Sequence, residues 1–258
     1  MKPNPLITQA STKCNSSNSL NLLLVAAFLA TIVVAPRLPS AAEAQDAADK
    51  KAENRINGVP ARDAATKKNL IDLSEHFNGS PREGWFPRTP NGGPADKALP
   101  LPLGVGRFEG IDFDVRGVIQ LSGTRMQRAG GEFPEAVKGI KVGLKCKRLH
   151  FLHAAGWAAD AYLPLGSKIG NFVVRYADGS EREISIVTGE DLRDWVQHDE
   201  DAISHGTVAW KGTTPNGLPA RVFTSHWENP QPDVEIKSID YISKMTDASP
   251  FLIAMTLE

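Results

Sequence analysis

The residues with the clearest chemical potential are the five tryptophans, of which Trp157 and Trp195 fall in predicted loops rich in Gly and Asp. A flat aromatic ring can cover the C–H face of a sugar while neighbouring polar groups hydrogen-bond to its hydroxyls. This pattern predicts a carbohydrate-binding site, formed by Trp157, Asp160, Arg193, Asp194 and Trp195. The alternative is packing in the core or between sheets, which we expect for three of the five tryptophans.

An acidic segment is the second candidate. Six carboxylates fall within twelve residues, namely Glu190, Asp191, Asp194, Asp199, Glu200 and Asp201. Calcium takes six to eight oxygen ligands, and such a segment beside a sheet could hold a structural calcium ion. The alternative is a solvated loop, because the ligand order of an EF-hand is absent. The same carboxylates could act with a histidine such as His198 as a general acid and base, but sequence does not give their separation.

The remaining reactive side chains indicate structural roles. His150 and His153 lie in a strand-like run, where a three-residue spacing sends side chains to opposite faces, so a shared metal site is not expected. His198, His205 and His226 lack a close Cys or His partner at zinc-site spacing and are predicted to be surface residues. Cys146 lies within another strand-like run and is expected to be buried as a small apolar residue.

The first 44 residues have the order of parts of a secretory signal peptide. Lys2 and Lys13 precede an apolar run over residues 22–35, and the triplet Ala42-Glu43-Ala44 follows. The run is shorter than the roughly 20 residues that a membrane-spanning helix needs. We therefore expect cleavage after Ala44 and a periplasmic or extracellular protein with no stable membrane span.

Composition then limits the function classes. Without residues 1–44 the chain has 26 basic and 29 acidic residues, a formal net charge of −3, which suggests no nucleic-acid or polybasic membrane partner. Cys146 is the only cysteine left, so no internal disulfide is expected and an apolar core must hold the fold. Neither a P-loop nor a G-x-S-x-G nucleophile elbow is present.

Short apolar runs separated by turn residues predict an all-β fold over residues 69–258. Residues 45–68 read as a flexible lead-in, residues 63–73 contain the best helical candidate, and residues 79–106, rich in Gly and Pro, read as an irregular surface connection. Predicted strands cover residues 111–115, 118–121, 140–144, 149–152, 169–176, 182–187, 207–210, 222–225, 234–242 and 251–257. Asp178-Gly179 between two β-prone runs predicts a hairpin, and the simplest architecture is an antiparallel β-sandwich.

Several segments resemble an accessory domain of bacterial exported and envelope proteins. They are residues 113–123 (FDVRGVIQLSG), 148–157 (RLHFLHAAGW), 169–179 (IGNFVVRYADG), 227–230 (WENP), 239–243 (IDYIS) and 250–256 (PFLIAMT). In this order, over residues 70–258, they are similar to galactose-binding-domain-like jelly rolls, including carbohydrate-binding modules attached to glycoside hydrolases. The resemblance implies a jelly-roll sandwich of eight or more strands and a role in recognition, and it carries over no catalytic residues.

The sequence thus favours an exported, non-catalytic binding protein with carbohydrate as the leading ligand. A small hydrolase acting on glycans is one rival, and an envelope module that recognises protein is another. No cofactor is indicated beyond the possible structural calcium.

Overall fold

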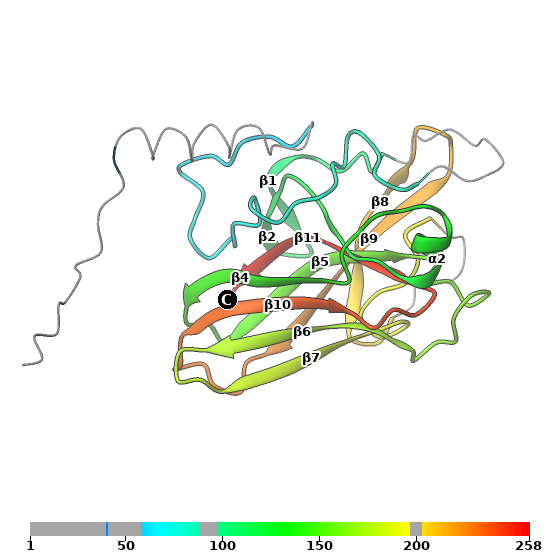
Figure 1. Cartoon of the computed structure of the whole chain (residues 1–258). Helices are drawn as coiled ribbons and strands as arrows, with labels where there is room; N and C mark the ends of the chain where they lie inside the picture. Colours follow the sequence, from blue (N-terminus) through cyan, green and yellow to red (C-terminus); the bar gives the residue numbers. More distant parts are fainter. Residues whose placement is uncertain (1–39, 41–57, 88–97, 197–202) are drawn as a thin grey trace, which may run out of the picture. The chain divides into compact units, whose positions relative to one another are not determined.

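The computed structural model describes residues 40, 58–87, 98–196 and 203–258 (Figure 1). The chain divides into two compact units, residues 1–48 and residues 49–258, and the description below concerns the second. The predicted signal peptide, apart from Ser40, and the part of the lead-in up to residue 57 lie outside the described residues.

The described residues form eleven strands and one short helix. They are β1 (Gly104–Phe108), β2 (Ile111–Val115), β3 (Ile119–Gln120), α2 (Thr124–Arg128), β4 (Ala136–Leu144), β5 (Arg148–Gly156), β6 (Lys168–Tyr176), β7 (Glu181–Val187), β8 (Gly206–Thr213), β9 (Pro219–Glu228), β10 (Ile236–Ser243) and β11 (Ser249–Leu257). Each of the ten predicted strands coincides with one of these elements, and only β1 lacks a counterpart in the prediction.

Two antiparallel sheets form a β-sandwich, as the sequence predicts (Figure 1). One sheet has the order β4-β10-β6-β7 and the other the order β3-β11-β5-β9-β8. The aromatic rings of Phe151, from β5, and Phe172, from β6, stack 4.3 Å apart, and Phe172 in turn stacks on Tyr241 at 4.8 Å. These rings fill the core between the two sheets.

The five-stranded sheet also packs on its outer face, the face turned away from the four-stranded sheet. Residues of the 79–106 stretch, expected at the surface, are buried there instead, including Trp85, Phe86, Leu99 and Leu101. The rings of Trp85 and Phe86 contact Phe251 of β11, whose strand is buried at every position. For these residues the surface prediction is wrong, because their apolar side chains cover a sheet whose second face would otherwise be exposed; residues 88–97 of the stretch lie outside the described residues.

Residues 58–74 pack onto the fold without forming a helix, through buried apolar side chains such as Leu70 and Leu73 and through charged groups. The helical candidate at residues 63–73 is wrong, since this stretch consists of turns and one isolated bridge. Arg62, expected in a flexible lead-in, places its Nη1 3.0 Å from Asp114 Oδ2 and its Nη2 within hydrogen-bonding distance of the Leu70 carbonyl. Arg116 Nε lies 2.9 Å from the same carboxylate, and its side chain and that of Asp114 are each only 4% exposed. Ordered structure therefore begins before residue 69.

The predicted hairpin joins β6 and β7. Gly179 N donates to the Tyr176 carbonyl at 3.1 Å, and Gly179 has φ of 86°. A three-residue loop built on a type I turn, with glycine in the left-handed region, fits this pattern. Asp178 supports the turn by accepting hydrogen bonds from the Ser180 amide and hydroxyl.

Candidate functional site

Trp195, predicted to project from a loop, is 1% exposed. Its ring stacks on Trp85 at 5.6 Å and on Phe86 at 5.1 Å, within the outer core. The segment that carries it runs beside β5, because Trp195 N donates to the Ala155 carbonyl at 3.0 Å. The expected surface position of Trp195 is therefore wrong, and the ring offers no free face to a ligand.

Asp194 and Arg193 are also buried, at 2% and 6% exposure. Asp194 Oδ2 accepts a hydrogen bond from Ala158 N and Oδ1 accepts one from Val196 N, both at 2.9 Å. Arg193 Nη1 lies 3.7 Å from the carboxylate of Asp160, which is exposed. These contacts hold the loops around residues 158 and 194 together. They favour a structural role for Arg193 and Asp194 over sugar binding.

Trp157 is the one predicted aromatic contact that reaches solvent. It is partly buried, lies 5.4 Å from the Phe86 ring and has φ of 53°, which is unusual for a bulky residue. The structure thus brings the five predicted residues into one region but leaves only Trp157 and Asp160 accessible. Neither residue lines the two grooves described below.

The acidic segment is only partly described. Asp191 Oδ2 accepts a hydrogen bond from Val187 N at 2.8 Å, and burial raises the pKa of this carboxyl. Glu190 lies 3.3 Å from His205 Nδ1. Residues 198–201, with His198 and three of the carboxylates, lie outside the described residues. Within the described part of the chain, no group of three or more His, Cys, Asp or Glu side chains is arranged to hold a metal ion.

A polar groove, named here the histidine groove, opens on the outer face of strands β5, β9 and β8. It has a volume of about 770 Å³ and is bounded on one side by the turn between β1 and β2. Its lining residues are Glu109, Ile111, Arg148, His150, Ser204, His205, Gly206, Thr207, Thr224, Ser225, His226 and Glu258. Ile111 is the only large apolar residue among them.

The strand register brings two histidines together in this groove. His150 of β5 is the direct partner of His226 of β9, and their ring centroids are 5.8 Å apart. His150 Nε2 lies 2.8 Å from Glu258 Oε2, and the His150 side chain is 9% exposed. This hydrogen bond, with Arg148 nearby, lowers the pKa of the Glu258 carboxyl. The pair forms a fixed polar floor for the groove.

The rim of the histidine groove is more accessible. The side chain of His226 is 51% exposed and that of His205 is 64% exposed. Thr207 of β8 and Thr224 of β9 are direct partners, so their hydroxyls lie on the same face of the sheet. Arg148 forms ion pairs with Glu228 and Glu258. The imidazole, hydroxyl and guanidinium groups of this rim can therefore donate hydrogen bonds to a ligand, and the hydroxyls can also accept them.

Sequence reasoning missed this groove because it treated His150, His205 and His226 separately. The signal that could have found it is the pairing register of β5 with β9. The expected opposite facing of His150 and His153 is confirmed: His153 is buried at 1% exposure, with Nε2 3.0 Å from Ser225 Oγ. Cys146 is buried as expected, and burial raises the pKa of its thiol to about 11.

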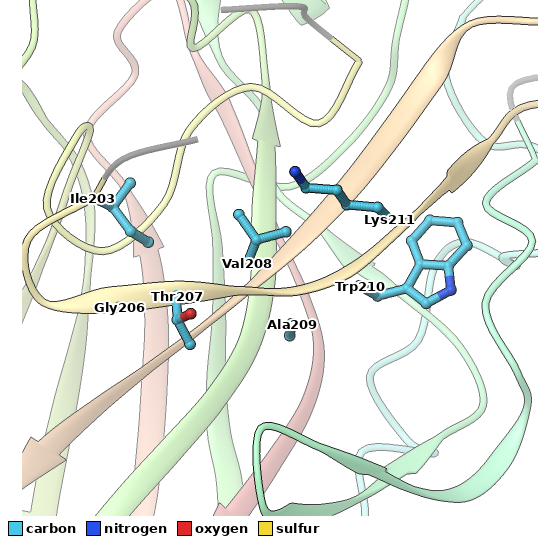
Figure 2. A pocket seen from close by; sticks show the side chains of 7 residues that line it. All are labelled: Ile203, Gly206, Thr207, Val208, Ala209, Trp210 and Lys211. Carbon is cyan, nitrogen blue, oxygen red and sulfur yellow. The ribbon is translucent and has the colours of Figure 1, made fainter. Parts of the chain in front are cut away.

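A second groove, the edge groove, is lined by residues of β8, the strand that ends the five-stranded sheet next to β9. Its volume is about 550 Å³. Figure 2 shows Val208 and Lys211 on one side of this strand and Thr207 on the other. Gly206 and Thr207 line both grooves, so the two meet at the beginning of β8.

The described residues thus form an antiparallel β-sandwich with a polar groove on the outer face of its five-stranded sheet. No protein-family model matches the chain, and the searches of curated proteins and of solved structures found no match. Over the described residues, no helix has the length and apolar character needed to cross a membrane.

Proposed function

We propose that this chain is an exported, non-catalytic recognition protein that binds carbohydrate in the histidine groove. The observation that carries the proposal is the groove lining, in which imidazoles, hydroxyls, carboxylates and a guanidinium converge from three strands and a hairpin turn. Each sugar hydroxyl can both donate and accept a hydrogen bond. Carboxylates accept, arginine donates, and neutral histidine and threonine do both, so this set matches a polyhydroxyl ligand.

Other ligand classes fit the groove less well. A lipid or other apolar ligand needs a mainly apolar pocket, whereas Ile111 is the only large apolar residue here. A polyanion needs an excess of cations, but Arg148 already pairs with Glu228 and Glu258. A neutral sugar needs neither a mainly apolar pocket nor an excess of cations. An open polar groove gives weak binding, with a dissociation constant of roughly micromolar to millimolar.

A hydrolytic role for the acidic segment has less support. Both carboxylate oxygens of Asp194 accept backbone hydrogen bonds in a buried position, which leaves this side chain poorly placed to handle a proton from a substrate. A relationship to galactose-binding-domain-like jelly rolls stays part of the proposal, supported by the sandwich architecture and by the segments at residues 113–123, 148–157 and 169–179.

A glycan array followed by isothermal titration calorimetry tests this proposal. The native protein should bind at least one class of neutral glycan. His226→Ala should weaken that binding roughly threefold to tenfold, the value of one hydrogen bond, without changing thermal stability, since this side chain is half exposed. His76→Ala is the matched control, because His76 lies outside both grooves. An array with no signal at millimolar glycan would reject carbohydrate binding.

A further inference from the structure

The two grooves along β8 share the lining residues Gly206 and Thr207, so they adjoin at the start of the strand, and together they are called the depression along β8. The histidine groove lies at the start of the strand, and the edge groove continues along it to Lys211. At about 3.3 Å per residue, the five steps from Gly206 to Lys211 span roughly 16 Å. This length exceeds one sugar ring.

A β-bulge sets which side chains face this depression. Val208 pairs with Phe223 and Trp210 pairs with Val222, so Ala209 is an extra residue in β8. In a regular strand, Thr207 and Trp210 would point to opposite faces, because they are three residues apart. With the bulge, both lie on the face of Val222 and Thr224, the face of the histidine groove.

On the opposite face of β8, the extra residue likewise brings together two side chains that are three residues apart. Figure 2 shows that Val208 and Lys211, also three residues apart, project to the same side, as the extra residue requires. After the bulge the strand alternates regularly again, so Lys211 points to the opposite face from Trp210. Bulges commonly redirect a side chain beside a binding site.

Trp210 is also positioned by a glycine. A β-carbon at Gly212 would lie 2.3 Å from the Trp210 ring, so the ring occupies the space that a side chain at position 212 would fill. Trp210 is only partly buried, and it lines the edge groove. The ring is therefore held along the strand, at the far end of the depression from His150 and His226.

We propose that the ligand is a linear oligosaccharide that extends from the histidine groove along β8, with Trp210 as a distant stacking site. This inference rests on the proposed carbohydrate binding and adds the chain length and the second contact. The polar groups of the histidine groove bind one end through hydroxyls. The Trp210 ring covers the C–H face of a sugar further along the chain.

The test is calorimetry of the full chain with ladders of cello-, xylo- and malto-oligosaccharides of one to six sugar units. In the ladder that binds, affinity should rise with length until the chain reaches Trp210 and then level off. Trp210→Ala should remove that gain, roughly fivefold to tenfold for one stacking contact, and leave the shortest bound sugar unaffected. Gly212→Ala, which displaces the ring without removing it, should have the same effect, and Trp210→Phe should restore part of the gain.

Trp157→Ala is the matched control, because it removes another partly buried tryptophan that lies outside both grooves. Binding that does not depend on chain length, or a length-dependent gain that survives Trp210→Ala, would overturn the extended site but leave the proposed function standing. Loss of the gain in Trp157→Ala would also overturn it and place the second contact at the 157 loop. Failure of every ladder, together with a silent glycan array, would reject carbohydrate binding itself.

Discussion

Two tryptophans that look alike in the sequence have different environments. Both Trp157 and Trp195 fall in predicted loops that contain Gly and Asp, yet Trp195 is enclosed by Trp85, Phe86 and Phe251. Trp157 contacts only Phe86 of these rings and keeps part of its surface in solvent. Loop position alone therefore does not indicate whether an aromatic ring is available to a ligand.

The energetic consequence is a difference in stability between two alanine variants. Trp195→Ala should lower the free energy of unfolding by about 3–5 kcal/mol, because it leaves a large cavity in the outer core. Trp157→Ala should cost clearly less, since the ring is only partly buried. Urea unfolding followed by far-ultraviolet circular dichroism measures both. Equal losses in the two variants would contradict the burial difference.

His153 gives the fold a specific dependence on pH. Burial lowers the pKa of this side chain from its ordinary value of 6.5 to about 3. The unfolded chain therefore binds a proton on this residue below about pH 6.5, while the folded chain does not. The contribution of His153 to stability is complete above pH 6.5 and is lost progressively as the pH falls toward 3, by an amount on the order of several kcal/mol.

The measurement compares the free energy of unfolding of the native protein and of His153→Gln between pH 4 and pH 8. The variant lacks the titrating group, so its stability should fall less steeply below pH 6.5, even though it starts from a lower value. Glutamine retains a polar group opposite the Ser225 hydroxyl. Parallel curves for the two proteins would show that His153 is protonated in the folded state.

At the scale of the element, strands and turns with a local signal in the sequence were easiest to predict. Strand β2 alternates apolar and acidic residues from Ile111 to Val115, and the turn at Gly179 needs a residue with positive φ. Both signals are local. The hairpin between β6 and β7 could therefore be predicted from a few neighbouring residues.

Elements whose structure depends on distant partners were predicted less well. Strand β1 begins at Gly104, with φ of 95°, and contains Gly106, so its composition resembles that of a turn. Strands β5 and β11 are buried on both faces, which removes the alternation that identifies a surface strand. The segment that covers their outer faces has no periodic pattern of its own.

The histidine groove and the edge groove depend on register, which single-sequence patterns do not give. The contact of His150 with His226 requires the pairing of β5 with β9, and the common face of Thr207 and Trp210 requires one extra residue at Ala209. A shift of one residue would reverse each face. The candidate site could therefore not be predicted, although most of its strands could.

At the scale of the whole molecule, the sandwich carries a second core on the outer face of its five-stranded sheet. The buried carboxylate of Asp114 helps to hold residues 58–74 onto the fold, because it contacts both Arg62 and Arg116. Removal of one partner from such a group leaves a buried charge without compensation. These ion pairs therefore tie residues 58–74 to the sandwich within the unit of residues 49–258.

The buried Cys146 bears on the proposed export. Burial raises the pKa of its thiol to about 11. A buried, protonated thiol forms mixed disulfides slowly, which is compatible with an oxidising compartment.

Expression of the full chain in a bacterial host, followed by cell fractionation and N-terminal sequencing, tests the export proposal. The extracytoplasmic protein should begin at Gln45, because Ala42 and Ala44 offer small side chains at the two positions that a signal peptidase reads. Ala44→Arg should block cleavage and leave the protein attached to the membrane through residues 22–35, whereas Ala47→Arg, beyond the cleavage site, should be processed normally. A native protein that retains residues 22–35, or stays in the cytoplasm at full length, would contradict export by a cleaved signal.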